Sequence, residues 1–269
     1  MTTFSLQLAD GIAHILLDRP DVLNSMTMDF WRELPLAVRD MDQGGKARVI
    51  VISATGRHFT SGMDLSVFAQ FGASGAPDRA RLRRMIETLQ DSFNAIAQAR
   101  VPVLAAIQGG CIGGGVDLVA ACDCRYATAD AFFVIQETNL AMLADCGTFP
   151  RLARLMPEGM VREMAFTGRR LPAPEALRLG LVNAVLPDAA SLSAHVMEVA
   201  RDIASKSPRT VAGAKRILEY GRDHSTAETL SQAAAWQTAT LSPAEVMEAM
   251  AAKAEKRMPV FADLPPLRK

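Results

Sequence analysis

The sequence predicts an α/β protein with a largely parallel sheet, followed by an all-helical C-terminal region. Two observations predict this class. In the first part of the chain, short apolar runs at residues 49–52 and 101–107 alternate with segments of helical periodicity. After about Thr148 the strand patterns almost cease, and predicted helices follow one another to the end of the chain. The alternation of strands with helices implies largely parallel pairing.

The elements follow in order from local patterns. Residues 4–8 and 12–17 flank Asp10-Gly11, a strong turn signal, and predict a β-hairpin. Apolar residues at helical spacing predict a helix over residues 27–41. The other elements expected before residue 148 are helices at 79–99 and 113–121 and strands at 49–52, 101–107, 124–127 and 132–135.

The second part of the chain is predicted to be helical. The expected helices are at residues 149–156, 158–166, 173–179, 189–205, 208–221, 226–240 and 243–257, with one strand at 181–186. No evident linker separates the two parts. We therefore place an α/β core at residues 1–190 and a helical region at 191–269, and we interpret residues 72–77 as a mobile surface loop.

Composition excludes several classes of protein. The chain has 269 residues, 49% of them apolar, with 29 Lys+Arg and 29 Asp+Glu, which is typical of a globular protein. Balanced charge argues against nucleic-acid binding. The sequence contains no run of about 18 apolar residues, so we expect no transmembrane helix. The first residues show no secretory or transit signal, so we expect a cytoplasmic protein without nucleic-acid or membrane partners.

The four cysteines indicate a reducing compartment. Cys111, Cys122, Cys124 and Cys146 are expected to be free thiols, because a chain of this length does not need disulfides. The Cys122-Asp123-Cys124 segment lacks the second ligand pair of a zinc site, and we expect no metal site.

The first segment that carries chemistry is Gly113-Gly114-Gly115, which follows a predicted strand and begins a predicted helix. Glycines there let a ligand approach the backbone, and the first N–H groups of a helix lack intrahelical partners. Such a site binds a phosphate, a carboxylate or a developing oxyanion. The spacing fits neither a dinucleotide fingerprint nor a P-loop. We therefore favour an oxyanion site over phosphate binding and over simple helix packing.

A second glycine loop, Ser61-Gly62-Met63, follows the predicted strand at 49–52 and precedes another expected helix. The N–H groups of Met63 and Gly114 would together form a two-donor oxyanion hole. His58 and Ser61 lie in the same loop, but no G-x-S-x-G elbow surrounds Ser61. We interpret His58 as a packing or surface residue.

Three acidic residues accompany these loops: Asp117, Glu137 and Asp145. Asp117 lies three residues after Gly114, so a helix would place its carboxylate on the same face as that N–H. Each acid also has an ordinary interpretation, with Asp117 complementing the helix dipole, Glu137 exposed to solvent and Asp145 acting as an N-cap. Together, beside an oxyanion hole, they predict acid–base machinery.

These segments resemble the crotonase, or enoyl-CoA hydratase/isomerase, superfamily over nearly the whole chain. The marks are Leu17-Asp18-Arg19-Pro20, Asn24-Ser25-Met26, Ser61-Gly62-Met63-Asp64-Leu65, and Gly113-Gly114-Gly115-Val116-Asp117-Leu118 with Cys122-Asp123. The resemblance implies a ββα spiral core with a C-terminal trimerisation region, in a trimer or a dimer of trimers. It also implies an acyl-coenzyme A thioester as substrate, with no separate cofactor and with the thioester oxygen bound by the N–H groups of Met63 and Gly114.

By the same resemblance, a further set of residues is expected around the substrate and its coenzyme A moiety: Ser25, Met26, Ser61, Gly62, Asp64, Leu65, Gly113, Lys256 and Phe261. Ser25, Met26 and Ser61 would act through backbone groups. Lys256 and Phe261 come from the C-terminal region and would contribute across a subunit boundary.

The acids indicate a branch of the superfamily. Its hydratases typically carry Glu at the positions matching Asp117 and Glu137, and Gly at the position matching Asp145. The Asp–Glu–Asp set is similar instead to Δ3,5-Δ2,4-dienoyl-CoA isomerases of fatty-acid β-oxidation. We assign Glu137 and Asp145 to proton removal at C2 and delivery at C6, leaving open which does which, and Asp117 to orienting or tuning Glu137. Hydration of 2-enoyl-CoA, Δ3-Δ2 isomerisation and non-catalytic binding are the alternatives.

Overall fold

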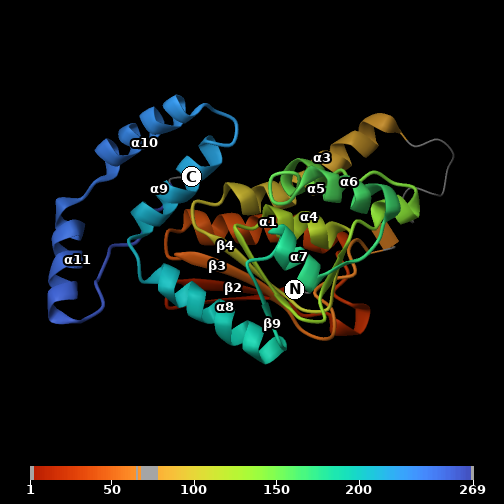
Figure 1. The fold of residues 1–269 in the computed structure, drawn as a ribbon, viewed down its shortest axis with the longest axis horizontal. Coiled ribbons are helices and arrows are strands. Elements are labelled where there is room, and N and C mark those ends of the chain that lie inside the picture. The colour runs from red at the N-terminus through yellow and green to blue at the C-terminus, as the bar shows by residue number, and fades with distance from the viewer. Residues whose placement is uncertain (1–2, 65, 68–77, 268–269) are drawn as a thin grey trace.

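The computed structural model describes residues 3–64, 66–67 and 78–267. A six-stranded sheet with strand order β1-β2-β3-β4-β6-β9 lies at the centre of the core (Figure 1). Its strands are β1 (Phe4–Ala9), β2 (Ile12–Leu17), β3 (Val49–Ala54), β4 (Val103–Ile107), β6 (Cys124–Thr128) and β9 (Ala184–Leu186). β1 and β2 pair antiparallel, and every later pair of neighbours is parallel. The predicted hairpin and parallel pairing are therefore confirmed.

A second, three-stranded sheet was not expected from the sequence. It consists of β5 (Gly110–Ile112), β7 (Phe132–Val134) and β8 (Leu171–Pro172), in the order β5-β7-β8. β5 pairs parallel to β7, and β8 pairs antiparallel to it. β7 matches the strand predicted at 132–135, but β5 and β8 were not predicted, because such short runs with Gly110 or Pro172 in them show no strand pattern. This sheet matters for the site because β5 leads directly into the helix that begins at Gly114.

Helices cover both faces of the six-stranded sheet (Figure 1). One face carries α1 (Met28–Gln43), α3 (Arg79–Gln98) and α4 (Gly114–Ala121), and the other carries α8 (Ala189–Ala204). In β3, Ile50 and Ile52 pack with the first group of helices, whereas Val49 and Val51 pack with α8. Since alternate residues of a strand face opposite sides, coverage on both faces explains the continuous apolar run at residues 49–52.

The remaining helices complete the chain. They are η1 (Pro20–Val22), η2 (Glu137–Leu140), α5 (Thr148–Leu152), α6 (Glu158–Thr167), α7 (Ala173–Leu179), α9 (Pro208–Tyr220), α10 (Thr226–Thr240) and α11 (Pro243–Glu255). α5 ends at Leu152, four residues before the predicted end at 156. The predicted loop at residues 72–77 lies outside the described residues.

The C-terminal helices differ from the core in what they bury. α8 packs on the sheet through Leu192, Val196 and Ala200, so the predicted boundary at residue 190 lies at the start of a helix that covers the core. The division into two regions stays a prediction. α10 and α11 lie apart from the sheet (Figure 1); α10 buries none of its residues and α11 buries only Ala252.

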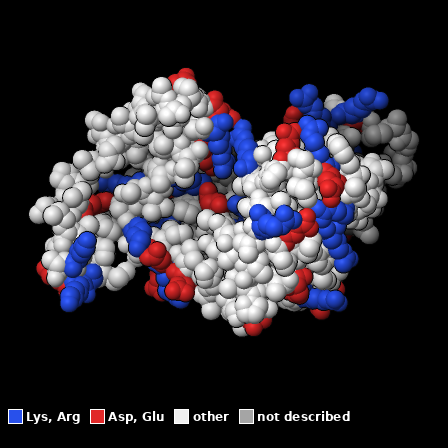
Figure 2. All heavy atoms as spheres, in the orientation of Figure 1, with Lys and Arg blue, Asp and Glu red and all other residues white. Residues whose placement is uncertain are grey.

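The molecular surface in Figure 2 shows Lys and Arg side chains interspersed with Asp and Glu, and a largely uncharged area over α10. Across residues 3–64, 66–67 and 78–267, no helix is both long enough and apolar enough to span a bilayer.

Candidate active site

A cavity of about 410 Å³ lies between α3, the start of α4 and the segment that contains η2. Its lining residues are Trp31, Ser61, Gly62, Met63, Leu82, Met85, Ile86, Leu89, Gly113, Gly114, Asp117, Gln136, Glu137, Leu140, Met142, Leu143, Asp145 and Cys146. Three separate parts of the chain thus bring the predicted acids, Asp117, Glu137 and Asp145, together with both predicted backbone donors, Met63 and Gly114.

The backbone of Met63 is fixed by a parallel bridge to Met26. The N–H of Met26 donates to Gly62 O at 2.8 Å, and the N–H of Asp64 donates to Met26 O at 3.0 Å. In this pattern the flanking residues bond to Met26, and Met63 directs its own N–H to the opposite edge. Within the described residues that N–H has no hydrogen-bond partner.

The Gly114 N–H lies at the first position of α4, where no intrahelical acceptor is available. The preceding N-cap, Gly113, has φ 54° and ψ −120°, a conformation restricted in practice to glycine. A Cβ placed on Gly62 would lie 3.4 Å from the Gly114 nitrogen. The two glycine loops are therefore in direct contact, as a two-donor oxyanion hole requires.

Close packing also contributes to the glycine run. A Cβ on Gly115 would approach Thr60 Cγ2 to 2.5 Å, and one on Gly114 would lie 3.2 Å from Met26 Sδ and 3.3 Å from Trp31 Cη2. The packing role that we set aside in the sequence is thus present beside the site role. Because a side chain at Gly114 would press on packed neighbours, a bulky substitution there tests packing as much as binding.

Glu137 begins η2, and its carboxyl group lies beside Gly113, the N-cap of α4. Its Oε1 would lie 3.0 Å from a Cβ on Gly113. Its Oε2 is buried and is the one buried side-chain polar atom without a hydrogen-bond partner in the described part of the chain. Burial, and then the nearby charge of Asp117, raise the pKa of Glu137 to about 7. A group with this pKa can accept or release a proton near neutrality.

Asp117, on the first turn of α4, is held by Thr148. Its Oδ1 accepts hydrogen bonds from the Thr148 N–H and the Thr148 hydroxyl, both at 2.7 Å. Asp117 as a whole is 2% exposed. Burial raises the pKa of Asp117 to about 6, and the two bonds from Thr148 oppose that rise.

Asp145 precedes α5 but does not cap it. The N-cap of α5 is Gly147, which provides no side-chain bond, so the ordinary N-cap interpretation of Asp145 is wrong. The Asp145 carboxylate accepts one long hydrogen bond from Cys146 Sγ, at 3.5 Å. It is therefore available to a ligand in the cavity.

Sequence reasoning missed the apolar wall of the cavity. Leu82, Met85, Ile86 and Leu89 lie on one stripe of α3, and Leu140, Met142 and Leu143 face them from the segment after Glu137. The i, i+3, i+4, i+7 spacing on α3 was visible in the sequence, but such a stripe ordinarily faces a core. Only the fold shows that part of it faces a cavity.

A second cavity, of about 690 Å³, shares four lining residues with the first: Ser61, Met63, Gln136 and Leu140. The predicted binding residues Ser25 and Asp64 lie here, and the Ser25 hydroxyl donates to Asp64 Oδ2 at 2.6 Å. Hydrogen bonds from Ser25 and Ser66 lower the pKa of Asp64 to about 2. Arg170, not predicted, also lines this cavity and lies 4.4 Å from the centre of the Phe132 ring.

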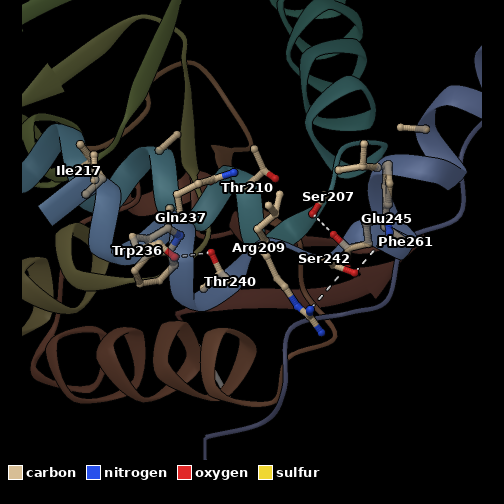
Figure 3. A pocket seen from close by; sticks show the side chains of 16 residues that line it. Ser207, Arg209, Thr210, Ile217, Trp236, Gln237, Thr240, Ser242, Glu245 and Phe261 are labelled. Atoms are coloured by element: carbon tan, nitrogen blue, oxygen red, sulfur yellow. Dashed lines mark hydrogen bonds and ion pairs between the residues drawn. The ribbon is translucent and has the colours of Figure 1, made fainter. Parts of the chain in front are cut away.

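The other predicted residues are placed as follows. Gly62 and Gly113 line the first cavity, and the Met26 side chain is fully buried beneath it. Leu65 lies outside the described residues. Lys256 is the C-cap of α11, and Phe261 lines another cavity, between α9, α10 and α11 (Figure 3). Within one chain, Lys256 and Phe261 do not join the site.

His58 has a packing role, as expected. Its Nδ1 accepts a hydrogen bond from the Gly110 N–H at 2.8 Å. Asn24 fixes the same loop, because its side-chain amide donates to the carbonyls of Thr55 and His58 at 2.9 and 3.0 Å. These bonds hold the loop that leads to Gly62 against β5.

Comparison with known proteins identifies the family of this chain. Residues 7–264 match the family model described as enoyl-CoA hydratase/isomerase. The chain belongs to the enoyl-CoA hydratase/isomerase family. A peroxisomal Δ3,5-Δ2,4-dienoyl-CoA isomerase of Arabidopsis thaliana is 41% identical over 260 residues, which cover 94% of each chain. A mitochondrial enzyme of the same name from Mus musculus is 41% identical over 252 residues, covering 91% of this chain and 77% of the relative.

Solved structures of this family share the fold. An enoyl-CoA hydratase of Bacillus anthracis is 30% identical, with a TM-score of 0.86, over 97% of this chain and 99% of that one. The expected crotonase-like α/β core with C-terminal helices is therefore confirmed, and the protein is an enzyme of the enoyl-CoA hydratase/isomerase family.

Proposed function

We propose that this enzyme converts 3,5-dienoyl-CoA into 2,4-dienoyl-CoA. The observation that carries the proposal is the meeting of Asp117, Glu137 and Asp145 in the cavity that also holds the backbones of Met63 and Gly114. The 41% identical relatives from A. thaliana and M. musculus, which are named for this reaction, support it.

The reaction moves one proton across a conjugated acyl chain. A carboxylate removes a proton from C2, and the electron pair of that C–H bond spreads through the two double bonds to C6. A carboxylic acid delivers a proton to C6, which leaves double bonds at C2 and C4. Glu137 and Asp145 form the acid–base pair. The pKa of Glu137, about 7, fits it for either task.

The intermediate is an enolate, whose negative charge gathers on the thioester oxygen. The N–H groups of Met63 and Gly114 bind this oxygen, and removal of one such donor typically costs about 10²–10³ in rate. Because the donors belong to the backbone of a bridged loop and a helix start, they need no reorganisation during the reaction. Coenzyme A is part of the substrate, so the reaction uses no separate cofactor.

Hydration is less well supported. A hydratase needs two carboxyl groups that hold one water between them. Asp117 Oδ1 already accepts two hydrogen bonds from Thr148, and its side chain is one methylene shorter than Glu. The third acid, Asp145, has no task in that reaction, whereas a proton delivered far from C2 requires a second carboxyl group.

An assay on the purified protein tests the proposal. With 3,5-dienoyl-CoA we expect rising absorbance of the conjugated 2,4-dienoyl product, and slow or no hydration of crotonyl-CoA at equal enzyme concentration. Brisk hydration of crotonyl-CoA without isomerisation would assign the enzyme to the hydratases. A chain that binds acyl-CoA without turning over either substrate would be a binding protein.

The assembly and compartment also remain proposals. A homotrimer, or a dimer of trimers, would cover the exposed apolar residues of the C-terminal helices, which include Leu230, Met247 and Met250 at 66%, 63% and 62% exposure. It would also give Lys256 and Phe261 a neighbouring site to reach. The cytoplasmic location predicted from the sequence is untested, and the names of related isomerases include peroxisomal and mitochondrial ones.

A further inference from the structure

Thr148 makes two hydrogen bonds that its own helix does not need. It is the first residue of α5 and is 1% exposed. Its N–H and its hydroxyl both donate to a single acceptor, Asp117 Oδ1, at 2.7 Å each. The acceptor comes from another helix, α4, 31 residues earlier in the chain. Thr148 does not itself line the substrate cavity.

Two donors on one carboxylate oxygen favour the ionised form of the acid. Buried in the core, Asp117 would otherwise be far easier to protonate. The other groups that face it act in both directions. The Arg151 guanidinium, on α5, favours the anion, and the Asp145 carboxylate opposes it. The thiols of Cys111 and Cys146, whose pKa values burial raises, remain uncharged near neutrality.

The charge of Asp117 affects the reaction through its influence on the pKa of Glu137. The negative charge of Asp117 is the second cause, after burial, that raises the pKa of Glu137. An ionised Asp117 therefore makes Glu137 a stronger base, and a protonated Asp117 makes it a weaker one. The two carboxyl groups titrate as a coupled pair.

We propose that Thr148 is a positioning residue, which through its two hydrogen bonds holds the Asp117 carboxylate in place in the cavity that it shares with Glu137. The inference rests on the proposed function for its kinetic consequence, but not for its effect on Asp117. The hydroxyl is the part that a substitution can remove, since Thr148→Val preserves shape and the N–H, and Thr148→Ser preserves both donors.

The experiment compares these two variants with the wild type by ¹³C NMR titration of the side-chain carboxyls, with Asp117→Asn identifying the Asp117 signal. In Thr148→Val we expect the Asp117 midpoint to rise by about one pH unit, because a hydrogen bond to a charged group is lost. In Thr148→Ser it should stay near the wild-type value. In kinetics, Thr148→Val should lower kcat for 3,5-dienoyl-CoA about tenfold with little change in KM, and Thr148→Ser should restore kcat.

The outcomes are distinguishable. If Thr148→Val lowers the melting temperature but leaves the Asp117 midpoint and kcat unchanged, Thr148 is only a structural contact and the proposal is wrong. If the wild type does not isomerise 3,5-dienoyl-CoA, the proposed function fails, yet the NMR midpoint still decides whether Thr148 controls Asp117. If Thr148→Val does not fold, the same titration on Thr148→Ala decides, and an unshifted midpoint there overturns the proposal.

Discussion

At the scale of single residues, Glu137 makes the stability of the fold depend on pH. Its Oε2 is buried without a partner, and its carboxyl group has a pKa of about 7 in the folded protein against 4.5 for an ordinary glutamate. The folded state therefore binds more protons than the unfolded state between these two values. The neutral carboxyl stabilises the fold fully below pH 4.5, and that contribution disappears as the pH rises through 7.

This loss of stability with rising pH leads to a prediction for Glu137→Gln. At pH 8 the variant should be more stable than the wild type by about 2–3 kcal/mol, because the amide avoids a buried charge, whereas at pH 4.5 the two should be nearly equal. Urea denaturation at both pH values measures the difference. Glu198→Gln, on the exposed face of α8, is the matched control. A gain that is the same at pH 4.5 and pH 8 would show that ionisation of Glu137 is not its cause.

For Asp145 we predict a large effect on catalysis and a small effect on stability. Its carboxylate makes no cap and only one long bond, to Cys146 Sγ. Asp145→Asn should therefore lower kcat for isomerisation by about 10²–10⁴, while the melting temperature stays within about 2 °C of the wild type. Steady-state kinetics and calorimetry on the same preparation test this. An undiminished kcat would remove Asp145 from the acid–base pair.

Local sequence patterns predicted several of the residues that the structure brings together in one cavity. Met63 and Gly114 were predicted because glycine loops at strand ends expose N–H groups, and Glu137 and Asp145 because they are acids that follow those loops; all four line the cavity. The bond between Asp117 and Thr148 was not predictable, since it joins two helices 31 residues apart. The sequence therefore identified the carboxyl groups but not what orients them.

At the scale of elements, helix α9 is joined to the core by a buried ion pair. Lys215 Nζ donates to Asp123 Oδ2 at 2.8 Å and to Val101 O at 3.2 Å, and the lysine side chain is 5% exposed. Asp123 Oδ2 also accepts the Val103 N–H at 2.7 Å. The pair connects α9 to the start of β4 and to the residue before β6.

Replacing Asp123 and replacing Lys215 should lower the free energy of unfolding by different amounts. Asp123→Asn leaves a buried ammonium group without its counter-charge and should lower the free energy of unfolding by about 3–5 kcal/mol. Lys215→Met replaces the charge with an apolar chain of similar length and should cost clearly less. Denaturant unfolding of the two variants and of the double variant measures the coupling between them. Equal losses in both single variants would mean that the buried charge is not the dominant factor.

Elements were predictable where their hydrophobic period was long enough. The helices from α8 onward and the strands β1 to β4 lie within a few residues of their predicted positions. β5 and β8 were missed because they are short and contain Gly110 and Pro172, which weaken a strand pattern, and their pairing with β7 is a property of the tertiary fold. The α3 stripe was visible, but its position beside a cavity depends on the helix packing.

At the scale of the whole molecule, the C-terminal helices leave much apolar surface uncovered. The large apolar side chains of this region that are more than 45% exposed are Leu218, Leu230, Leu241, Val246, Met247, Met250, Met258, Val260 and Leu267. α11 also leaves the α9–α11 cavity, of about 470 Å³, open beside Trp236 and Phe261 (Figure 3). So many exposed large apolar side chains in one region are typical of a protein interface.

Charges introduced into this surface should therefore dissociate the assembly. We expect Met247→Glu combined with Met250→Glu, on α11, to shift the protein from a trimer or hexamer to a monomer at micromolar concentration, because a buried unpaired carboxylate costs several kcal/mol at each interface. Sedimentation velocity measures the mass, and Lys253→Gln, an exposed change on the same helix, is the control. Catalysis should fall along with assembly if Lys256 and Phe261 reach a neighbouring site, and it should persist in the monomer if each chain is complete. A wild-type protein that sediments as a monomer would contradict the proposed assembly, and would leave the exposed methionines of α11 without the partner inferred for them.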